Sequence, residues 1–132
     1  MKLEDNKKCF VCGPENRYGL HLEFVIDKNN IIQTEFVPLE QHQGFKGIVH
    51  GGLIGLILDE IMVNLTWKLG KNAVSAELNI GLKRVAKVGE KLIFRGWIDK
   101  EDKKIIYTKA EAKDENGAVV ATATAKCIRV KE

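Results

Sequence analysis

The sequence predicts an α+β fold in which a curved antiparallel sheet of about six strands wraps around one long central helix. Residues Gly51–Leu69 are rich in Leu and Ile and carry no breaker after Gly55, so this segment is predicted to be helical. The flanking segments alternate apolar and polar residues, as strands do. The helix is apolar nearly all round and needs cover on nearly every side, which a curved sheet supplies.

Two strands are predicted before the helix. Residues Leu20–Ile26 alternate between apolar and polar and are predicted to form a half-buried strand. Asn29-Asn30 is a turn signal, and Ile31–Val37 is predicted to return as the second strand. The proline and glycines of Pro38–Gly47 predict a loop leading into the helix.

Gly70 is well placed to end the helix, and the remainder is predicted to be all-β. Asn116-Gly117 predicts a tight hairpin turn with positive φ at both central residues. The small residues Ala121, Ala123 and Ala125 would let the helix approach the sheet closely. The four predicted strands are Val74–Leu82, Leu92–Ile98, Ile105–Ala112 and Val119–Val130.

The first of these strands is predicted to present two different faces. Its apolar face would carry Val74, Ala76, Leu78, Ile80 and Leu82, and its other face Ser75, Glu77 and Asn79.

Length and composition predict a single globular domain, residues 1–132, with residues 1–8 as a flexible N-terminal extension. A chain that is 45% hydrophobic can bury a core, which excludes intrinsic disorder. The net charge is +3, from 21 basic and 18 acidic residues, without a long basic run. No nucleic-acid partner is therefore predicted.

Three cysteines and the polar segment Met1–Lys8 favour a reducing compartment, and the chain is predicted to be cytoplasmic. Charged residues interrupt the apolar segment Leu53–Leu69, so no membrane span is predicted. Cys9 and Cys12 could form half of a zinc site, but four ligands are normally needed and the sequence has no second pair. A turn with buried thiols is the favoured interpretation, and no metal or cofactor is predicted.

His50-Gly51-Gly52 directly precedes the predicted helix. The first turn of a helix has free N–H groups at the positive end of the helix dipole, and these favour developing negative charge. Glycines leave those donors open to a substrate carbonyl, so the segment is a candidate oxyanion site. A glycine pair that only makes a tight turn into the helix is the alternative.

Asp59 is the anomalous residue of the helix. None of its neighbours three and four positions away can pair with it, and an unpaired carboxylate on an apolar face is costly. Asp59 is therefore a candidate general base or nucleophile, unless a loop from another part of the fold satisfies it. Glu60, Asn64 and Lys68 recur every four residues and are predicted to form a solvated stripe.

The spacing along the helix also predicts how the protein assembles. Gly52 and Asp59 are seven residues apart, or about 10 Å along the axis, which is too far for both to act on one carbonyl. Two antiparallel copies related by a two-fold axis would bring the glycines of one chain near Asp59 of the other. We therefore expect a homodimer with two shared active sites.

Several motifs at their particular spacing resemble one known family. The loop Gln43–Gly52 followed by Asp59, the strand Ser75–Ile80 and the pair Lys83-Arg84 resemble the hotdog-fold acyl-CoA thioesterase superfamily, in its phenylacetyl-CoA thioesterase (PaaI-like) branch. Cys9–Gly13 resembles an N-terminal signature found in one subset. The resemblance implies the hotdog fold and hydrolysis of acyl-CoA to free acid and CoA.

The resemblance also implies residue roles. Asp59 would activate water or attack the thioester directly. The amides of Gly51 and Gly52 would polarise the carbonyl, and His50 would hold the loop or bond the thioester oxygen. Ser75 would orient water or substrate, Gln43 is the nearest polar candidate in the loop, and Lys83 and Arg84 would bind CoA phosphates.

Relatives are homodimers or homotetramers (dimers of dimers) that use no metal. Two alternatives remain open: a non-catalytic acyl-CoA-binding or regulatory hotdog protein, and a hotdog enoyl-CoA hydratase or dehydratase.

Overall fold

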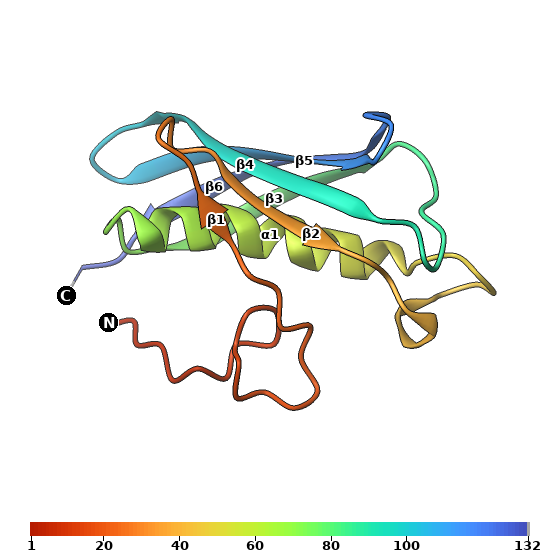
Figure 1. Cartoon of the computed structure of the whole chain (residues 1–132). Coiled ribbons are helices and arrows are strands. Elements are labelled where there is room, and N and C mark those ends of the chain that lie inside the picture. The colour runs from red at the N-terminus through yellow and green to blue at the C-terminus, as the bar shows by residue number, and fades with distance from the viewer. Residues whose placement is uncertain (132) are drawn as a thin grey trace.

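The computed structural model describes residues 1–131 and confirms the predicted α+β architecture (Figure 1). One long helix lies against one face of a six-stranded antiparallel sheet. Within residues 1–131, no helix combines the length and apolar character needed to cross a membrane. The elements in chain order are β1 (Val25–Ile26), β2 (Ile32–Phe36), the 3₁₀ helix η1 (Glu40–His42), α1 (Gly51–Lys68), β3 (Ala73–Leu82), β4 (Leu92–Glu101), β5 (Ile105–Asp114) and β6 (Val119–Arg129).

The strand order in the sheet is β1-β2-β4-β5-β6-β3, and every pairing is antiparallel. The ten-residue strand β3 therefore forms one edge and pairs only with β6 among the described strands. Long unpaired edges offer a row of backbone donors and acceptors to another strand. β3 is accordingly the natural place for a second chain to add to this sheet.

The helix begins and ends close to the predicted residues. His50 is its N-cap, and Gly70, with φ of +73°, follows its C-terminal residue Lys68 and cap Leu69. The row of alanines in β6 is at most 5% exposed, so the helix does approach closely there. The helix residues that form the centre of the core are Ile54, Ile57, Leu58, Ile61, Met62 and Leu65.

The predicted strand Leu20–Ile26 is wrong in extent, because only Val25–Ile26 pairs with β2. The amides of Leu20 and Leu22 instead donate to the carbonyls of Phe10 and Val11, at 2.9 Å each. His21 also has φ of +53°, which no strand residue adopts. Contacts inside the N-terminal segment thus replaced the sheet pairing that the alternation indicated.

Residues 1–24, here called the N-terminal arm, lie on the side of α1 away from the sheet (Figure 1). Val11 is 1% exposed and belongs to the core, and Cys9 packs against it. The arm thus covers the second side of a helix that is apolar nearly all round. It also covers part of the predicted solvated stripe: Glu60 and Asn64 are half-buried beneath it, and only Lys68 is exposed.

The predicted turn at Asn116-Gly117 differs in type. Only Gly117 has positive φ, at +84°, whereas a tight two-residue turn needs it at both positions. The Asp114 carboxylate accepts hydrogen bonds from the amides of Asn116 and Ala118, which shapes a longer loop. Beside this loop the register of β5 and β6 shifts between Ala112 and Lys113, because Val120 is an extra residue in β6.

Candidate active site

The start of α1 lies at the predicted residues, and the hydrogen bonding there indicates the tautomer of a neutral His50. The Gly52 amide donates to His50 Nδ1 at 3.0 Å, which caps the helix. Because Nδ1 must accept, a neutral His50 carries its proton on Nε2, which is free to donate to a substrate oxygen. The Gly52 amide is therefore already engaged. No hydrogen bond of the described chain uses the Gly51 amide, which leaves it as the open donor at the helix terminus.

Gly51, Gly55 and Asp59 recur every four residues and share the face of α1 that lies against β3. A Cβ added to Gly51 would lie 2.7 Å from Leu82 Cδ1, and one at Gly55 would lie 3.6 Å from Ile80 Cγ1. Helix and strand thus run antiparallel in close contact, and the glycines permit that approach. One further turn along the helix places Asp59 beside the earlier half of β3.

Asp59 lacks a partner, as the sequence indicates. Its Oδ1 atom is buried and accepts no hydrogen bond within residues 1–131. The Asp59 charge also reaches β6: burial raises the pKa of the Cys127 thiol, and the nearby Asp59 carboxylate raises it further. No loop from elsewhere in the described chain satisfies this oxygen, so the alternative structural role for Asp59 has no support.

A β-bulge in β3 brings Ser75 to the same region. Ser75 pairs with the buried Cys127, but Glu77 pairs with Lys126, so Ala76 is an extra residue in the ladder. Paired residues share a face, and Ser75 therefore faces the helix together with Leu78. The prediction that placed Val74 and Ala76 on that face is wrong for Val74, which pairs with the exposed Ile128. Ser75 thus lies opposite Cys127, the residue whose thiol the Asp59 charge reaches.

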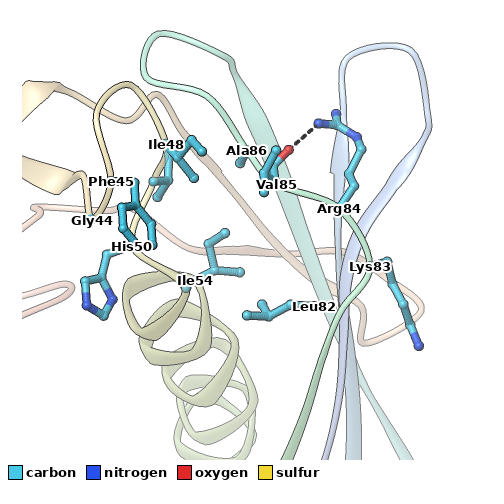
Figure 2. Close-up of a pocket in the computed structure, with 12 residues that line it drawn as sticks. Gly44, Phe45, Ile48, His50, Ile54, Leu82, Lys83, Arg84, Val85 and Ala86 are labelled. Atoms are coloured by element: carbon cyan, nitrogen blue, oxygen red, sulfur yellow. Dashed lines mark hydrogen bonds between the residues drawn. The ribbon is translucent and has the colours of Figure 1, made fainter.

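An apolar hollow of about 590 Å³ adjoins Gly51 and His50 (Figure 2). Sequence reasoning missed its walls, although Phe45 is 84% exposed at its edge, an unusual position for an aromatic ring. The other apolar lining residues are Ile48, Val49, Ile54, Leu82, Val85 and Ala86.

Lys83 and Arg84 also border this hollow, but they differ in whether their charge is already paired with a carboxylate of the chain. Figure 2 shows both side chains pointing away from the hollow. Arg84 bonds Glu90 at 3.2 Å and Asp114 at 2.5 Å, and these hydrogen bonds raise the pKa of its guanidinium. Lys83 makes no ion pair within residues 1–131. Arg84 is thus committed to neighbouring carboxylates, while Lys83 remains a free cation.

Gln43 lies in a second hollow, on the other side of His50. Its Oε1 atom accepts from the Gly47 amide at 2.7 Å, which closes the loop before the helix. This hollow is shared by Gln43, His50 and Gly52 with residues of the N-terminal arm, among them Phe10 and Tyr18. One chain therefore gathers His50, Gly51, Gly52 and Gln43 at the helix start, with Asp59 and Ser75 two turns away.

A sequence model of the thioesterase superfamily matches residues 46–121, which run from the loop before α1 into β6. The chain belongs to the thioesterase superfamily. The matched segment contains the capped helix start, Asp59 and the bulged strand β3. The N-terminal arm lies outside it.

Among curated relatives, mouse acyl-coenzyme A thioesterase 13 is 31% identical over 74 residues, or 54% of this chain and 53% of the relative. The human protein of the same name matches to the same extent. The chain thus spans about half the length of the curated relatives it matches.

Solved structures confirm the hotdog fold of this family. A thioesterase superfamily protein superimposes with a TM-score of 0.88 at 23% identity, over 92% of this chain and 60% of that one. The Escherichia coli PaaI protein from the phenylacetic acid degradation operon gives 0.79 at 17% identity, over 85% and 81%. A thioesterase protein from Streptococcus pneumoniae TIGR4, solved with coenzyme A, gives 0.78 at 16%, over 84% and 87%.

Proposed function

We propose that this protein hydrolyses acyl-CoA thioesters, with Asp59 as general base or nucleophile and the Gly51 amide as oxyanion donor. The observation that carries the proposal is the buried, unpartnered Oδ1 atom of Asp59 on the same helix face as the open Gly51 amide. The names of the curated relatives and the coenzyme A in the pneumococcal structure support the substrate class.

In the proposed reaction, a water oxygen attacks the thioester carbonyl carbon while Asp59 accepts the water proton. The carbonyl oxygen becomes negatively charged, and the Gly51 N–H and the His50 Nε2–H donate to it. The carbon–sulfur bond then breaks, and the proton held by Asp59 passes to the departing sulfur. The products are a carboxylic acid and CoA thiol.

The two groups must come from different chains. Gly51 and Asp59 are eight residues apart, or about 12 Å along the axis, whereas both must lie about 3 Å from the reacting atoms. We propose a homodimer in which the β3 edges of two copies pair antiparallel, so that each site combines the Gly51 amide of one chain with Asp59 of the other. The exposed Leu78 and Leu82 on this edge supply apolar area for the contact.

The remaining ligand contacts follow from the two hollows beside His50. We propose that the apolar hollow adjoining Gly51 receives apolar parts of the substrate and that Lys83 attracts CoA phosphates. Arg84 holds the segment between β3 and β4 in place through its ion pairs with Glu90 and Asp114. Ser75 orients the attacking water beside Asp59. We further propose that the protein is a single domain, works in the reducing cytoplasm, and assembles as a dimer or a dimer of dimers.

Release of CoA thiol from short-chain, long-chain and aromatic acyl-CoAs, followed with a thiol reagent, tests the activity. The protein's own free cysteines also react, so each trace is corrected with enzyme lacking substrate. Release that vanishes in Asp59→Asn supports hydrolysis. Tight acyl-CoA binding without release would instead indicate a binding protein, and hydration of an enoyl-CoA without free thiol would indicate a hydratase.

Gly51→Pro tests the oxyanion donor with little disturbance of the backbone. Gly51 is the first residue of α1, where proline is well tolerated, and His50 has φ of −59° and ψ of 125°, which suits a residue before proline. The variant removes one N–H group. Gly51→Ala is the matched control, because it adds a Cβ near Leu82 but keeps the amide.

Mixing inactive Asp59→Asn with inactive Gly51→Pro tests the shared site. Each heterodimer would contain one site with both intact groups and one site with neither. Random exchange would therefore restore about a quarter of the wild-type sites. Complete absence of recovery, with heterodimers demonstrated by mass spectrometry, would place both groups in one chain and reject the shared site.

A further inference from the structure

The N-terminal arm forms a turn around Cys9-Phe10-Val11-Cys12-Gly13 that the proposed hydrolysis does not use. The Cys12 amide donates to Cys9 Sγ at 3.5 Å, and the Gly13 amide donates to the Cys9 carbonyl at 2.8 Å. A Cβ on Gly13 would lie 2.3 Å from the Cys9 nitrogen, so only glycine fits. The turn thus holds both thiols on one side and directs a backbone N–H at a sulfur, where it would stabilise a thiolate.

A carboxylate from α1 completes this group. Glu60 Oε1 lies 2.7 Å from Cys9 Sγ, and the ligand atoms of Cys9, Cys12 and Glu60 all lie within 4.8 Å of one another. Zinc–sulfur and zinc–oxygen bonds of about 2.3 and 2.0–2.2 Å in a tetrahedron place neighbouring ligand atoms about 3.4–3.8 Å apart. All the separations lie within about 1 Å of that range or below it, so small side-chain rotations suffice.

Within the described chain, the surroundings of the group hold a carboxylate that no cation neutralises and one buried polar atom that has no hydrogen-bond partner. No ion pair within residues 1–131 involves Glu60. Asn64, one helical turn further on, directs Nδ2 at Cys12 Sγ, 3.7 Å away, while its Oδ1 is buried and accepts no hydrogen bond. A hollow of about 490 Å³ beside the two cysteines gives an ion access. Buried orphan polar atoms of this kind are rare in native proteins.

We propose that Cys9, Cys12 and Glu60 bind one zinc ion that fastens the N-terminal arm to α1. Two thiolates and a carboxylate are ligands that zinc accepts, and metals that prefer oxygen donors do not suit them. Asn64 supplies the fourth position, directly through Oδ1 or by holding a bound water. On binding, the two thiols release their protons to solvent, and both sulfurs bind the ion as thiolates without a protein base.

The site would connect the arm with the region of His50. Arm residues Phe10, Tyr18 and Leu20 line the hollow that also contains His50 and Gly52. A metal at Cys9 and Cys12 would therefore fix one wall of that hollow. Because the binding free energy of a structural metal contributes to folding, its loss would also lower the melting temperature.

The experiment measures metal directly, so it does not depend on whether the protein is a thioesterase. Tag-free protein is purified without chelators, and zinc per chain is measured by mass spectrometry; an equimolar amount is expected. Apo-protein is then titrated with cobalt(II), which should give the thiolate-to-cobalt charge-transfer band and the visible bands of a tetrahedral site. Zinc should displace the cobalt and abolish both signals.

Variants identify the ligands. Cys9→Ser, Cys12→Ser and Glu60→Gln should each lose the equimolar zinc and weaken or abolish the cobalt spectrum. Cys127→Ser is the matched control, because this thiol lies on β6 and contacts Thr108. A wild-type protein that holds no zinc and gives no charge-transfer band with cobalt would overturn the proposal without any variant. So would a Cys127→Ser protein that loses metal as completely as Cys9→Ser.

Discussion

Replacement of Asp59 by asparagine should stabilise the protein and abolish its hydrolysis. Asp59 keeps a buried oxygen without a hydrogen-bond donor, and such a group costs about 1–3 kcal/mol. Asparagine keeps nearly the same shape and one unpartnered polar atom but carries no charge, and a neutral amide is less costly to bury than a carboxylate, so we expect a gain of about 1–2 kcal/mol in the free energy of unfolding. The same change removes the proposed acceptor of the water proton, which should lower kcat by about 10²–10⁴.

The stability gain converts into a measurable shift. For 132 residues, the unfolding entropy is about 0.28 kcal/mol/K, so 1–2 kcal/mol corresponds to a rise in Tm of about 4–7 °C. Calorimetry at equal protein concentration measures it, because dimer stability depends on concentration. Asp99→Asn is the matched control: this carboxylate is 43% exposed and pairs with Lys109 at 3.7 Å, so Tm should hardly change. A variant at position 59 that melts lower while hydrolysing normally would refute the reasoning.

Three further predictions concern Leu78 on the edge strand β3, Arg84 at the border of the apolar hollow, and His42 in the 3₁₀ helix η1. Leu78→Asp on the exposed β3 edge should give monomers by light scattering and lose hydrolysis, because each proposed site combines groups from two chains. Arg84→Met should lower the unfolding free energy by about 0.5–1 kcal/mol and leave KM for acyl-CoA unchanged, since the lost contacts are to the protein's own Glu90 and Asp114 carboxylates and Val85 carbonyl. Burial lowers the pKa of His42, whose Nδ1 accepts from the Leu39 amide. The folded state therefore binds this proton less tightly, and stability should fall as the pH drops below about 6.5; thermal melts of His42→Gln should lose that component.

The spacing of apolar residues was enough to predict the helix and the four strands that follow it. The helix and the four strands after it are found within a few residues of their expected bounds, because their apolar residues recur at helical or strand spacing. The unpaired Asp59 could also be recognised, because its possible partners on the helix were all visible in the sequence. These features need only a window of about ten residues.

The errors arose where distant segments meet. Leu20–Phe24 alternates like a strand, but its backbone bonds are taken by Phe10 and Val11, and no pattern within the segment shows that. Glu60 was assigned to a solvated stripe because its partner Cys9 is 51 positions away. The bulge at Ala76 changes which side of β3 faces the helix without changing its composition. In each case a contact with a segment distant in the sequence decided the local structure.

The contact between α1 and β3 explains why the proposed site needs the sheet edge. Glycines at 51 and 55 allow the helix to lie directly against Leu82 and Ile80, so the helix face that carries Asp59 follows the last strand of the sheet. A carboxylate beside an inner strand would be sealed by its neighbours. In the proposed dimer, the partner's β3 would add about 4.8 Å beyond this edge strand, on the open side that Asp59 borders. In the proposed dimer, this edge would provide both the contact between chains and the access of a second chain to Asp59, so that monomer formation and loss of the site should be inseparable.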